Sequence, residues 1–187
     1  GFDPNKDLLS IDKMLVLDQW IVSKTADLQS QVVNEYDEYN FHLAMKMILN
    51  FCTNDLGGFY LDIIKDRQYT TQANSLARRS AQSALYHIAH AMVRWMTPVL
   101  SFTAEEVWQY LPGASNESVF LQTWYEGLVS DFNSSAIDTA RDVNIHLRKE
   151  LEEMRRDKVI GSSLDAEVDI YCNDENYQAL GELKNEL

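Results

Sequence analysis

Residues 74–96 read NSLARRSAQSALYHIAHAMVRWM, and this stretch decides the fold class of the 187-residue chain. Its small and apolar residues recur at three- and four-residue steps, which places them on one face of an α-helix. They are Ala77, Ala81, Ala84, Ile88, Ala91 and Trp95. Because most of this face is alanine, a second helix can pack closely against it, and Pro98 ends or kinks the helix soon afterwards. The stretch therefore predicts a helical bundle.

Similar periodicity on the N-terminal side predicts two more helices. Apolar residues from Met14 to Tyr36 are spaced for one long amphipathic helix. Asn40 is a suitable N-cap for the next helix, whose apolar stripe continues to Ile63. Gly57-Gly58 lies inside that stripe, where it either breaks the helix or lets a neighbouring backbone approach closely. We favour the close approach.

The C-terminal side mixes helical and extended patterns. Thr103-Ala-Glu-Glu106 fits a capping box that begins a short helix, and Pro112-Gly113 ends it. Another helix is expected to start at Ser134 or Ser135 and to continue through Met154. Residues 164–172 then alternate apolar and polar side chains, which predicts the one strand of the chain. A last helix begins near Asn173.

These patterns predict a mainly α fold in two parts. Residues 1–133 form a bundle of four to five helices, and residues 134–187 form a helix–strand–helix appendage. A single strand without a partner leaves its backbone donors and acceptors unpaired. We therefore expect the appendage to be a truncated α+β unit, cut from a longer protein.

The composition narrows the class of protein. The two cysteines, Cys52 and Cys172, lie 120 residues apart and encode neither a disulfide framework nor a cysteine-based zinc site. No apolar run reaches the ~18 residues that suggest a membrane span, and no signal peptide opens the chain. We therefore expect a cytoplasmic protein.

The charge is acidic overall but unevenly distributed. The 29 Asp and Glu residues outnumber 16 Lys and Arg residues, and the net charge of −13 by itself argues against a nucleic-acid partner. However, the 38 residues between Asp66 and Glu105 contain no carboxylate, where about six would be expected in proportion. The arginines of this span lack local counter-charges and predict a positive stripe. Residues 148–158 instead interleave both signs, which predicts a solvated helix face with ion pairs.

Motifs for catalysis are weak in this sequence. His87-Ile-Ala-His90 resembles a nucleotide-binding HIGH tetrapeptide or a metal-binding pair, but it lies inside the helical stripe and has no apparent third ligand. We expect two core or helix-surface histidines instead. The sequence contains no phosphate-binding glycine loop, nucleophile elbow or Cys-x-x-Cys pair. The chain is therefore expected to bind a partner and to carry no catalytic residue.

A recognition site is expected where the second helix turns into the third. Residues 65–71, KDRQYTT, combine cationic, amide and aromatic side chains, and two arginines follow on the next helix. Single-stranded RNA is bound by such groups, because cations contact phosphates, planar groups stack on bases and amides read base edges. The candidate residues are Lys65, Arg67, Gln68, Tyr69, Arg78 and Arg79.

The chemistry of each candidate suggests its role. Lys65 and Arg79 suit phosphates, Arg67 and Gln68 suit phosphates or base edges, and Tyr69 suits stacking. In the alternative interpretation, Tyr69 packs inward and the arginines pair with carboxylates elsewhere. Arg94, further along the same span, is expected to be structural.

Three segments stand out together: FYLDIIKDRQYT at 59–70, ARRS at 77–80 leading into YHIAH at 86–90, and TPVLSFTAEEVW at 97–108. They closely resemble the anticodon-binding region of bacterial isoleucyl-tRNA synthetases. Valyl and leucyl synthetases share the third segment in looser form, whereas KDRQYT indicates the isoleucyl family. The similarity covers essentially the whole chain and is strongest over residues 36–127.

The resemblance implies that the chain is part of a class I ligase that uses ATP and Mg²⁺ to esterify isoleucine to its tRNA. The catalytic and editing domains would lie before this chain and a zinc-binding module after it, so no cofactor or metal is expected here. The implied partners are the anticodon arm of the isoleucine tRNA and the other domains of the same ligase, with no membrane. The alternative is a helical module that packs between domains of the same or a related synthetase without touching RNA.

Overall fold

The computed structural model describes residues 1–133, 135–162 and 165–183. Within those ranges all regular secondary structure is helical, which confirms the prediction of a mainly α fold. The chain divides into two compact units, an N-terminal unit (Gly1–Phe132) and a C-terminal unit (Asn133–Leu187). None of the described helices combines the length and the apolar composition that crossing a bilayer requires.

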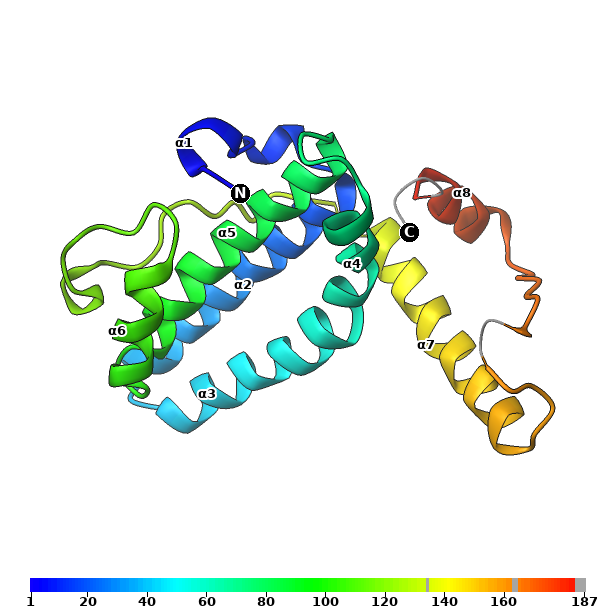
Figure 1. Cartoon of the computed structure of the whole chain (residues 1–187). Helices are drawn as coiled ribbons and strands as arrows, with labels where there is room; N and C mark the ends of the chain where they lie inside the picture. The colour runs from blue at the N-terminus through cyan, green and yellow to red at the C-terminus, as the bar shows by residue number, and fades with distance from the viewer. Residues whose placement is uncertain (134, 163–164, 184–187) are drawn as a thin grey trace. The chain divides into compact units, whose positions relative to one another are not determined.

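The N-terminal unit is built around two long helices, α2 (Val16–Asp37) and α5 (Leu76–Met96), which lie side by side (Figure 1). The start of α5 lies within two residues of the predicted one, because Ser75 is the N-cap and its hydroxyl accepts a hydrogen bond from the Arg78 N–H at 3.3 Å. Residues of the predicted stripe are fully buried, among them Ala81, Ala84, Ala91 and Trp95. Small side chains on α5 thus allow the close packing that the sequence predicted.

A second helical run has three segments without a break between them. They are α3 (Phe41–Asn50), the π-helical η2 (Phe51–Tyr60) and α4 (Leu61–Thr70). A Cβ atom at Gly57 would lie 3.1 Å from the Cys52 carbonyl oxygen, and one at Gly58 would lie 3.0 Å from that of Thr53. These carbonyls belong to the same helical run. The expected approach of a neighbouring backbone is therefore wrong, and the glycines instead relieve crowding within the π-helical turns.

Two shorter elements, α6 (Ser101–Tyr110) and η3 (Val119–Leu121), pack on α5. They share a buried cluster made of Val93, Ala104, Trp108 and Val119. The predicted capping box is wrong, because α6 begins two residues before Thr103 and no side chain caps its start. The chain turns directly out of α5, with the Leu100 N–H donating to the Met96 carbonyl at 2.7 Å, so Thr103 lies inside the helix.

The first residues of the chain are held against α5. They form α1 (Pro4–Asp7) and the 3-10 turn η1 (Ile11–Lys13). The Leu9 N–H donates to the Ser83 hydroxyl at 2.9 Å, and the Leu15 N–H donates to the Ser80 hydroxyl at 2.7 Å. Two serines in the buried part of α5 thus fix the entry into α2.

The C-terminal unit contains α7 (Ser135–Arg156) and α8 (Asp174–Glu182), which pack against each other. Residues 165–173, just before α8, form no strand, so the predicted strand is wrong; its first residue, Leu164, lies outside the described residues. A strand needs a neighbour to share its backbone hydrogen bonds, and the described part of the chain supplies none. Asn173, the predicted start of the last helix, is its N-cap and accepts from the Asn176 N–H at 2.9 Å.

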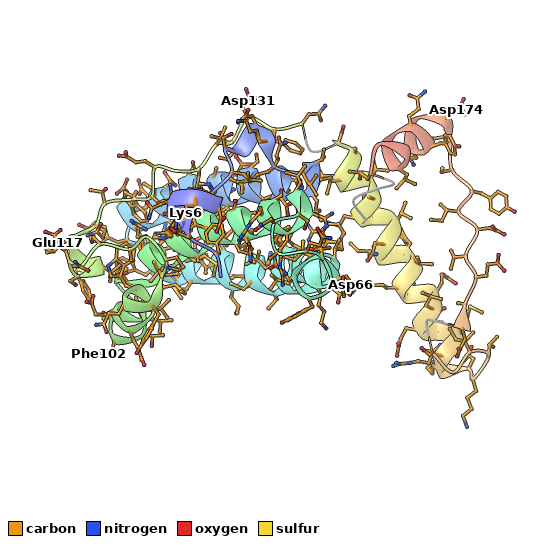
Figure 2. All side chains as sticks on the ribbon, turned by 45° about the horizontal axis from the view of Figure 1, so that its top comes forward. Lys6, Asp66, Phe102, Glu117, Asp131 and Asp174 are labelled. Atoms are coloured by element: carbon orange, nitrogen blue, oxygen red, sulfur yellow. The ribbon has the colours of Figure 1, made fainter. Side chains whose placement is uncertain are left out.

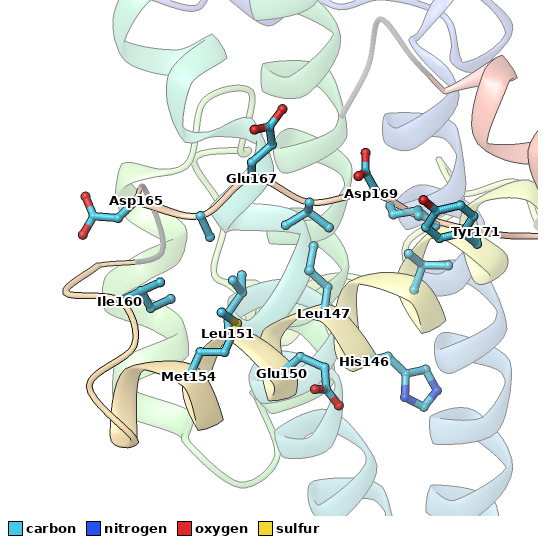
Figure 3. A pocket seen from close by; sticks show the side chains of 14 residues that line it. His146, Leu147, Glu150, Leu151, Met154, Ile160, Asp165, Glu167, Asp169 and Tyr171 are labelled. Atoms are coloured by element: carbon cyan, nitrogen blue, oxygen red, sulfur yellow. The ribbon is translucent and has the colours of Figure 1, made fainter.

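The alternating pattern of residues 165–171 instead reflects how this segment faces α7. In Figure 3, Leu147 and Leu151 point from α7 toward the segment, whereas Glu167 and Asp169 point away from α7. A hollow of about 650 Å³ lies between the helix and the segment. The basic residues at the end of α7 are solvated, as predicted: Arg155 pairs with Glu152 at 2.9 Å and both side chains are mostly exposed.

Candidate nucleic-acid interface

A buried carboxylate on α2 organises the end of the bundle where α4 meets α5. Asp18 is fully buried, and its oxygens accept hydrogen bonds from the Tyr60 hydroxyl at 2.6 Å and the Ser80 hydroxyl at 2.5 Å. The guanidinium of Arg67 lies 3.5 Å from the same carboxylate. Burial, together with the adjacent charge of Asp18, raises the pKa of the Tyr60 hydroxyl well above its usual value.

Asp18 is a residue that the sequence reasoning missed. It lies four residues after the buried Met14 and three before the buried Ile21, so its position on α2 belongs to the apolar face. A carboxylate on the apolar face of a helix needs a buried partner. This position is the signal that could have identified Asp18 from the sequence. Its partner Arg67 lies 49 residues away in the chain, and no local pattern connects the two.

The connection between α4 and α5 is closed by Arg78. Its guanidinium donates to the Thr71 carbonyl at 3.0 Å and also to the Gln68 carbonyl. The Thr71 hydroxyl donates in turn to the Arg67 carbonyl at 2.6 Å, and the Ser75 hydroxyl donates to the Thr71 hydroxyl at 3.1 Å. Arg78 therefore caps the carbonyl end of α4 from the first turn of the next helix.

Arg79 joins the same end of α5 to the N-terminal segment. Its guanidinium lies 3.2 Å from the carboxylate of Asp7, and the two side chains are 14% and 21% exposed. It also donates to the side-chain oxygens of Gln82 at 2.9 Å and Asn74 at 3.1 Å. The charge of Arg79 is thus largely satisfied within the protein.

These contacts change the interpretation of the carboxylate-free span. The sequence predicted a positive stripe because no acid lies between Asp66 and Glu105. In the fold, however, two of its arginines meet Asp18 and Asp7, which come from α2 and α1. The stripe is therefore partly neutralised by acids from outside the span.

Three of the six candidates lie together beside a hollow. Lys65, Gln68 and Tyr69 line a cavity of about 450 Å³ together with Leu61 and Leu85. The Lys65 side chain is exposed, and Tyr69 is 80% exposed, so Tyr69 does not pack inward. The side-chain nitrogen of Gln68 is buried and has no hydrogen-bond acceptor among the described residues. The candidates thus divide into three internally bonded arginines and three residues beside the hollow.

The two histidines lie in the other half of α5 and are buried. His87 Nδ1 is 2.8 Å from the Tyr125 hydroxyl, and His90 Nε2 is 2.9 Å from the Pro112 carbonyl oxygen. Burial, with a smaller contribution from the charge of His90, lowers the pKa of His87 to about 4. Both are core histidines, which was the interpretation favoured from sequence. The described residues hold no group of three or more His, Cys, Asp and Glu side chains that could bind a metal ion.

Arg94 lies one turn after His90 and is enclosed by aromatic rings. Its guanidinium carbon is 4.7 Å from the centre of the Trp108 ring and 5.2 Å from that of Tyr125. It also donates to the His90 carbonyl at 2.6 Å. This arrangement lies at the α6 end of the N-terminal unit, which Phe102 marks in Figure 2, whereas Asp66 marks the α4 end.

Comparisons with known proteins agree with this architecture. A family model described as the anticodon-binding domain of tRNA ligase matches residues 18–170. Over the whole chain, the isoleucine–tRNA ligases of Ruthia magnifica subsp. Calyptogena magnifica and Nitrosococcus oceani are 58% and 53% identical, and that of Pasteurella multocida is 50% identical. The chain spans about a fifth of the length of these curated relatives. It belongs to the anticodon-binding domain family of tRNA ligases.

Proposed function

We propose that this chain binds the anticodon arm of an isoleucine tRNA as part of an isoleucine–tRNA ligase. The observation that carries the proposal is the similarity along all of the chain to isoleucine–tRNA ligases, at 58% and 53% identity. The match to the anticodon-binding family supports the anticodon arm as the part of the tRNA that is bound.

The proposal extends to the parent ligase, which charges the tRNA with isoleucine in the cytoplasm. We place the binding of ATP and Mg²⁺, and a zinc site, in the rest of that ligase, as the resemblance implies. The catalytic and C-terminal domains of that parent ligase are then the protein partners of the present residues. The role of the present residues is to hold the tRNA.

We assign direct RNA contact to the exposed residues at the end of α4. Lys65 and Tyr69 are four residues apart, so they share one face of the helix. The ammonium of Lys65 suits a phosphate, and the exposed ring of Tyr69 suits stacking on a base of the loop. Gln68 lies between them, and because its amide nitrogen is buried we assign only its side-chain oxygen to a base edge.

The three arginines mainly hold this end of the bundle in place. Arg67, Arg78 and Arg79 use part of their guanidinium groups for internal contacts. A guanidinium has five N–H donors, so the exposed edge of Arg67 or Arg79 can still donate to a phosphate. We therefore assign these arginines a positioning role first and an RNA contact second.

The test measures how this chain binds an RNA stem-loop that has the sequence of an isoleucine tRNA anticodon arm. Fluorescence anisotropy of the RNA reports the affinity at each of several salt concentrations. Because binding to phosphates releases counterions, affinity should fall steeply as salt increases. Lys65→Ala should weaken binding and reduce the salt slope by about one. Lys46→Ala, an exposed lysine on α3, is the matched control and should leave both unchanged. Equal affinities and slopes for the two variants would contradict the assignment of Lys65.

Interdomain packing is the second candidate function, and the α6 end favours it. Several large apolar side chains are exposed there, including Phe102 at 93%, Tyr110 at 82% and Leu121 at 71%. Exposed apolar groups of this kind are typical of protein interfaces. If packing is the only function of the chain, the stem-loop should show no salt-dependent binding.

A further inference from the structure

We propose that Asp7, in the short helix α1, is a specificity-determining residue for RNA binding. Its carboxylate neutralises Arg79 on α5 and so limits the binding of RNA that lacks the correct loop. The inference rests on the proposed RNA-binding function and adds to it a residue from outside the α4 end. Its evidence is the geometry of one ion pair and the way the N-terminal segment is fixed on α5.

The ion pair between Asp7 and Arg79 is close and largely shielded from solvent. The carboxylate lies 3.2 Å from the guanidinium, and the two side chains are 21% and 14% exposed, so salt screens this pair less than an exposed one. Asn74 and Gln82 also accept from Arg79, but both are neutral. Among the described residues, Asp7 therefore supplies the one counter-charge of Arg79.

The segment that carries Asp7 is fixed on α5 on both sides of this residue (Figure 1). Before it, the ring centre of Phe2 lies 6.0 Å from that of Tyr86, and after it, the Leu9 N–H donates to the Ser83 hydroxyl at 2.9 Å. The Asp7 carboxylate also accepts from the Asp3 N–H at 2.8 Å. The carboxylate is thus positioned at Arg79 by its backbone, unlike the long side chains of surface ion pairs, which lose entropy when they pair.

This pairing affects RNA through competition for the guanidinium. A carboxylate and a phosphate accept from the same N–H groups of an arginine, and every RNA offers phosphates whatever its sequence. A flexible strand can place a phosphate at any available cation, whereas a stem-loop held by its base contacts has its phosphates in fixed places. By occupying Arg79, Asp7 therefore lowers sequence-independent binding more than binding of the correct loop.

The experiment compares two RNAs, the anticodon-arm stem-loop and a short oligouridine, by fluorescence anisotropy across a salt series. Asp7→Asn keeps the shape and one acceptor oxygen of the side chain but removes its charge. It should tighten binding of the oligouridine about fivefold, the size expected for one ion pair, and steepen the salt slope by about one. The stem-loop should gain less than about twofold, so the preference of the chain for the stem-loop falls.

Three variants test whether the charge of Asp7 acts through Arg79. Asp12→Asn is the matched control, because Asp12 lies on the same segment, is exposed and pairs with no cation among the described residues; it should bind both RNAs as the unmodified chain does. Asp7→Glu keeps the charge and should also match the unmodified chain. Adding Arg79→Gln to Asp7→Asn should remove the gain in oligouridine binding.

The outcomes separate this inference from the proposed function. If Lys65→Ala weakens stem-loop binding but Asp7→Asn binds both RNAs as Asp12→Asn does, the role of Asp7 is refuted and the RNA-binding function stands. An equal gain for both RNAs, or a gain that survives Arg79→Gln, also refutes it. If the unmodified chain shows no salt-dependent binding, both proposals are refuted. Circular dichroism and thermal unfolding establish that each variant is folded, and Asp7→Ser is a second neutral variant that must show the same gain.

Discussion

The two ends of α5 contain similar residues and use them differently. At the α4 end, Arg67 and Arg79 each meet a carboxylate from another helix, and exposed Lys65 and Tyr69 lie beside a hollow. At the α6 end, Arg94 is enclosed by aromatic rings and donates to a backbone carbonyl. The arginines at both ends come from one carboxylate-free span of sequence.

The difference shows that an arginine count does not measure a charged surface. Arginines at the α4 end are fixed by acids distant in the chain, while Arg94 is stabilised by ring faces, which attract cations. The exposed recognition groups at the α4 end are therefore a lysine, Lys65, and a tyrosine, Tyr69. The comparison also predicts that disturbing the two ends has different consequences for stability, pH dependence and RNA binding.

The largest effect is expected from Asp18→Ala. The change leaves Arg67 and the Tyr60 hydroxyl without their shared buried acceptor, which should destabilise the chain by about 3–5 kcal/mol. Urea unfolding measures the loss. Asp12→Ala, at an exposed position just before α2, is the control and should change stability by less than about 0.5 kcal/mol. If both variants unfold at the same urea concentration, the carboxylate does not organise the α4 end.

The next effect concerns pH and the α6 end. The pKa of His87 is lowered to about 4 by burial and by the charge of His90, against ~6.5 in the unfolded chain. The unfolded state therefore binds more protons below pH 6.5, so stability is full above that pH and falls as the pH drops toward 4, by up to about 3 kcal/mol.

His87→Gln tests this pH dependence because glutamine can still hydrogen-bond the Tyr125 hydroxyl without taking up a proton. Urea unfolding at several values between pH 7 and pH 4 should show a shallower loss of stability for the variant. His42→Gln, at an exposed position on α3, should keep the steeper loss. Identical pH profiles for the unmodified chain and His87→Gln would exclude His87 as the source.

The smallest effect on stability is expected at Tyr69, which is 80% exposed. Tyr69→Ala should change the free energy of unfolding by less than about 0.5 kcal/mol, yet it should weaken stem-loop binding about tenfold by removing a stacking ring. Tyr110→Ala makes the matched comparison, since Tyr110 is 82% exposed at the α6 end. Equal RNA affinities for the two variants would show that the α4 end has no special part in binding.

The helices were predictable because their signals are local. The three- and four-residue spacing of α5, its start near Asn74 and the stop before Pro98 all depend on neighbouring residues. The strand prediction failed because a strand depends on a second segment that shares its backbone hydrogen bonds. The alternation at 165–171 shows only that this segment has one apolar side. The prediction of a capping box at Thr103 failed for a similar reason. The turn that follows α5 makes α6 begin at Ser101, earlier than the residues of α6 indicate by themselves.

The candidate site was predictable as a region but not as a set of contacts. Residue types in KDRQYTT identified the connection, and the structure shows three of the candidates beside one hollow. The engagement of Arg67 and Arg79 could not be foreseen, because their acids come from α2 and α1 and only folding brings them close. Asp18 was recognisable by its helical register alone.

The capping of α4 by Arg78 has a consequence for the kinetics and thermodynamics of recognition. Because its guanidinium bonds the Thr71 and Gln68 carbonyls, the turn that carries Tyr69 is already ordered before any partner arrives. A preorganised protein surface loses little conformational entropy on binding. The ordering then falls on the flexible RNA loop, so loop sequences that are already splayed open should associate faster than those that must first unstack.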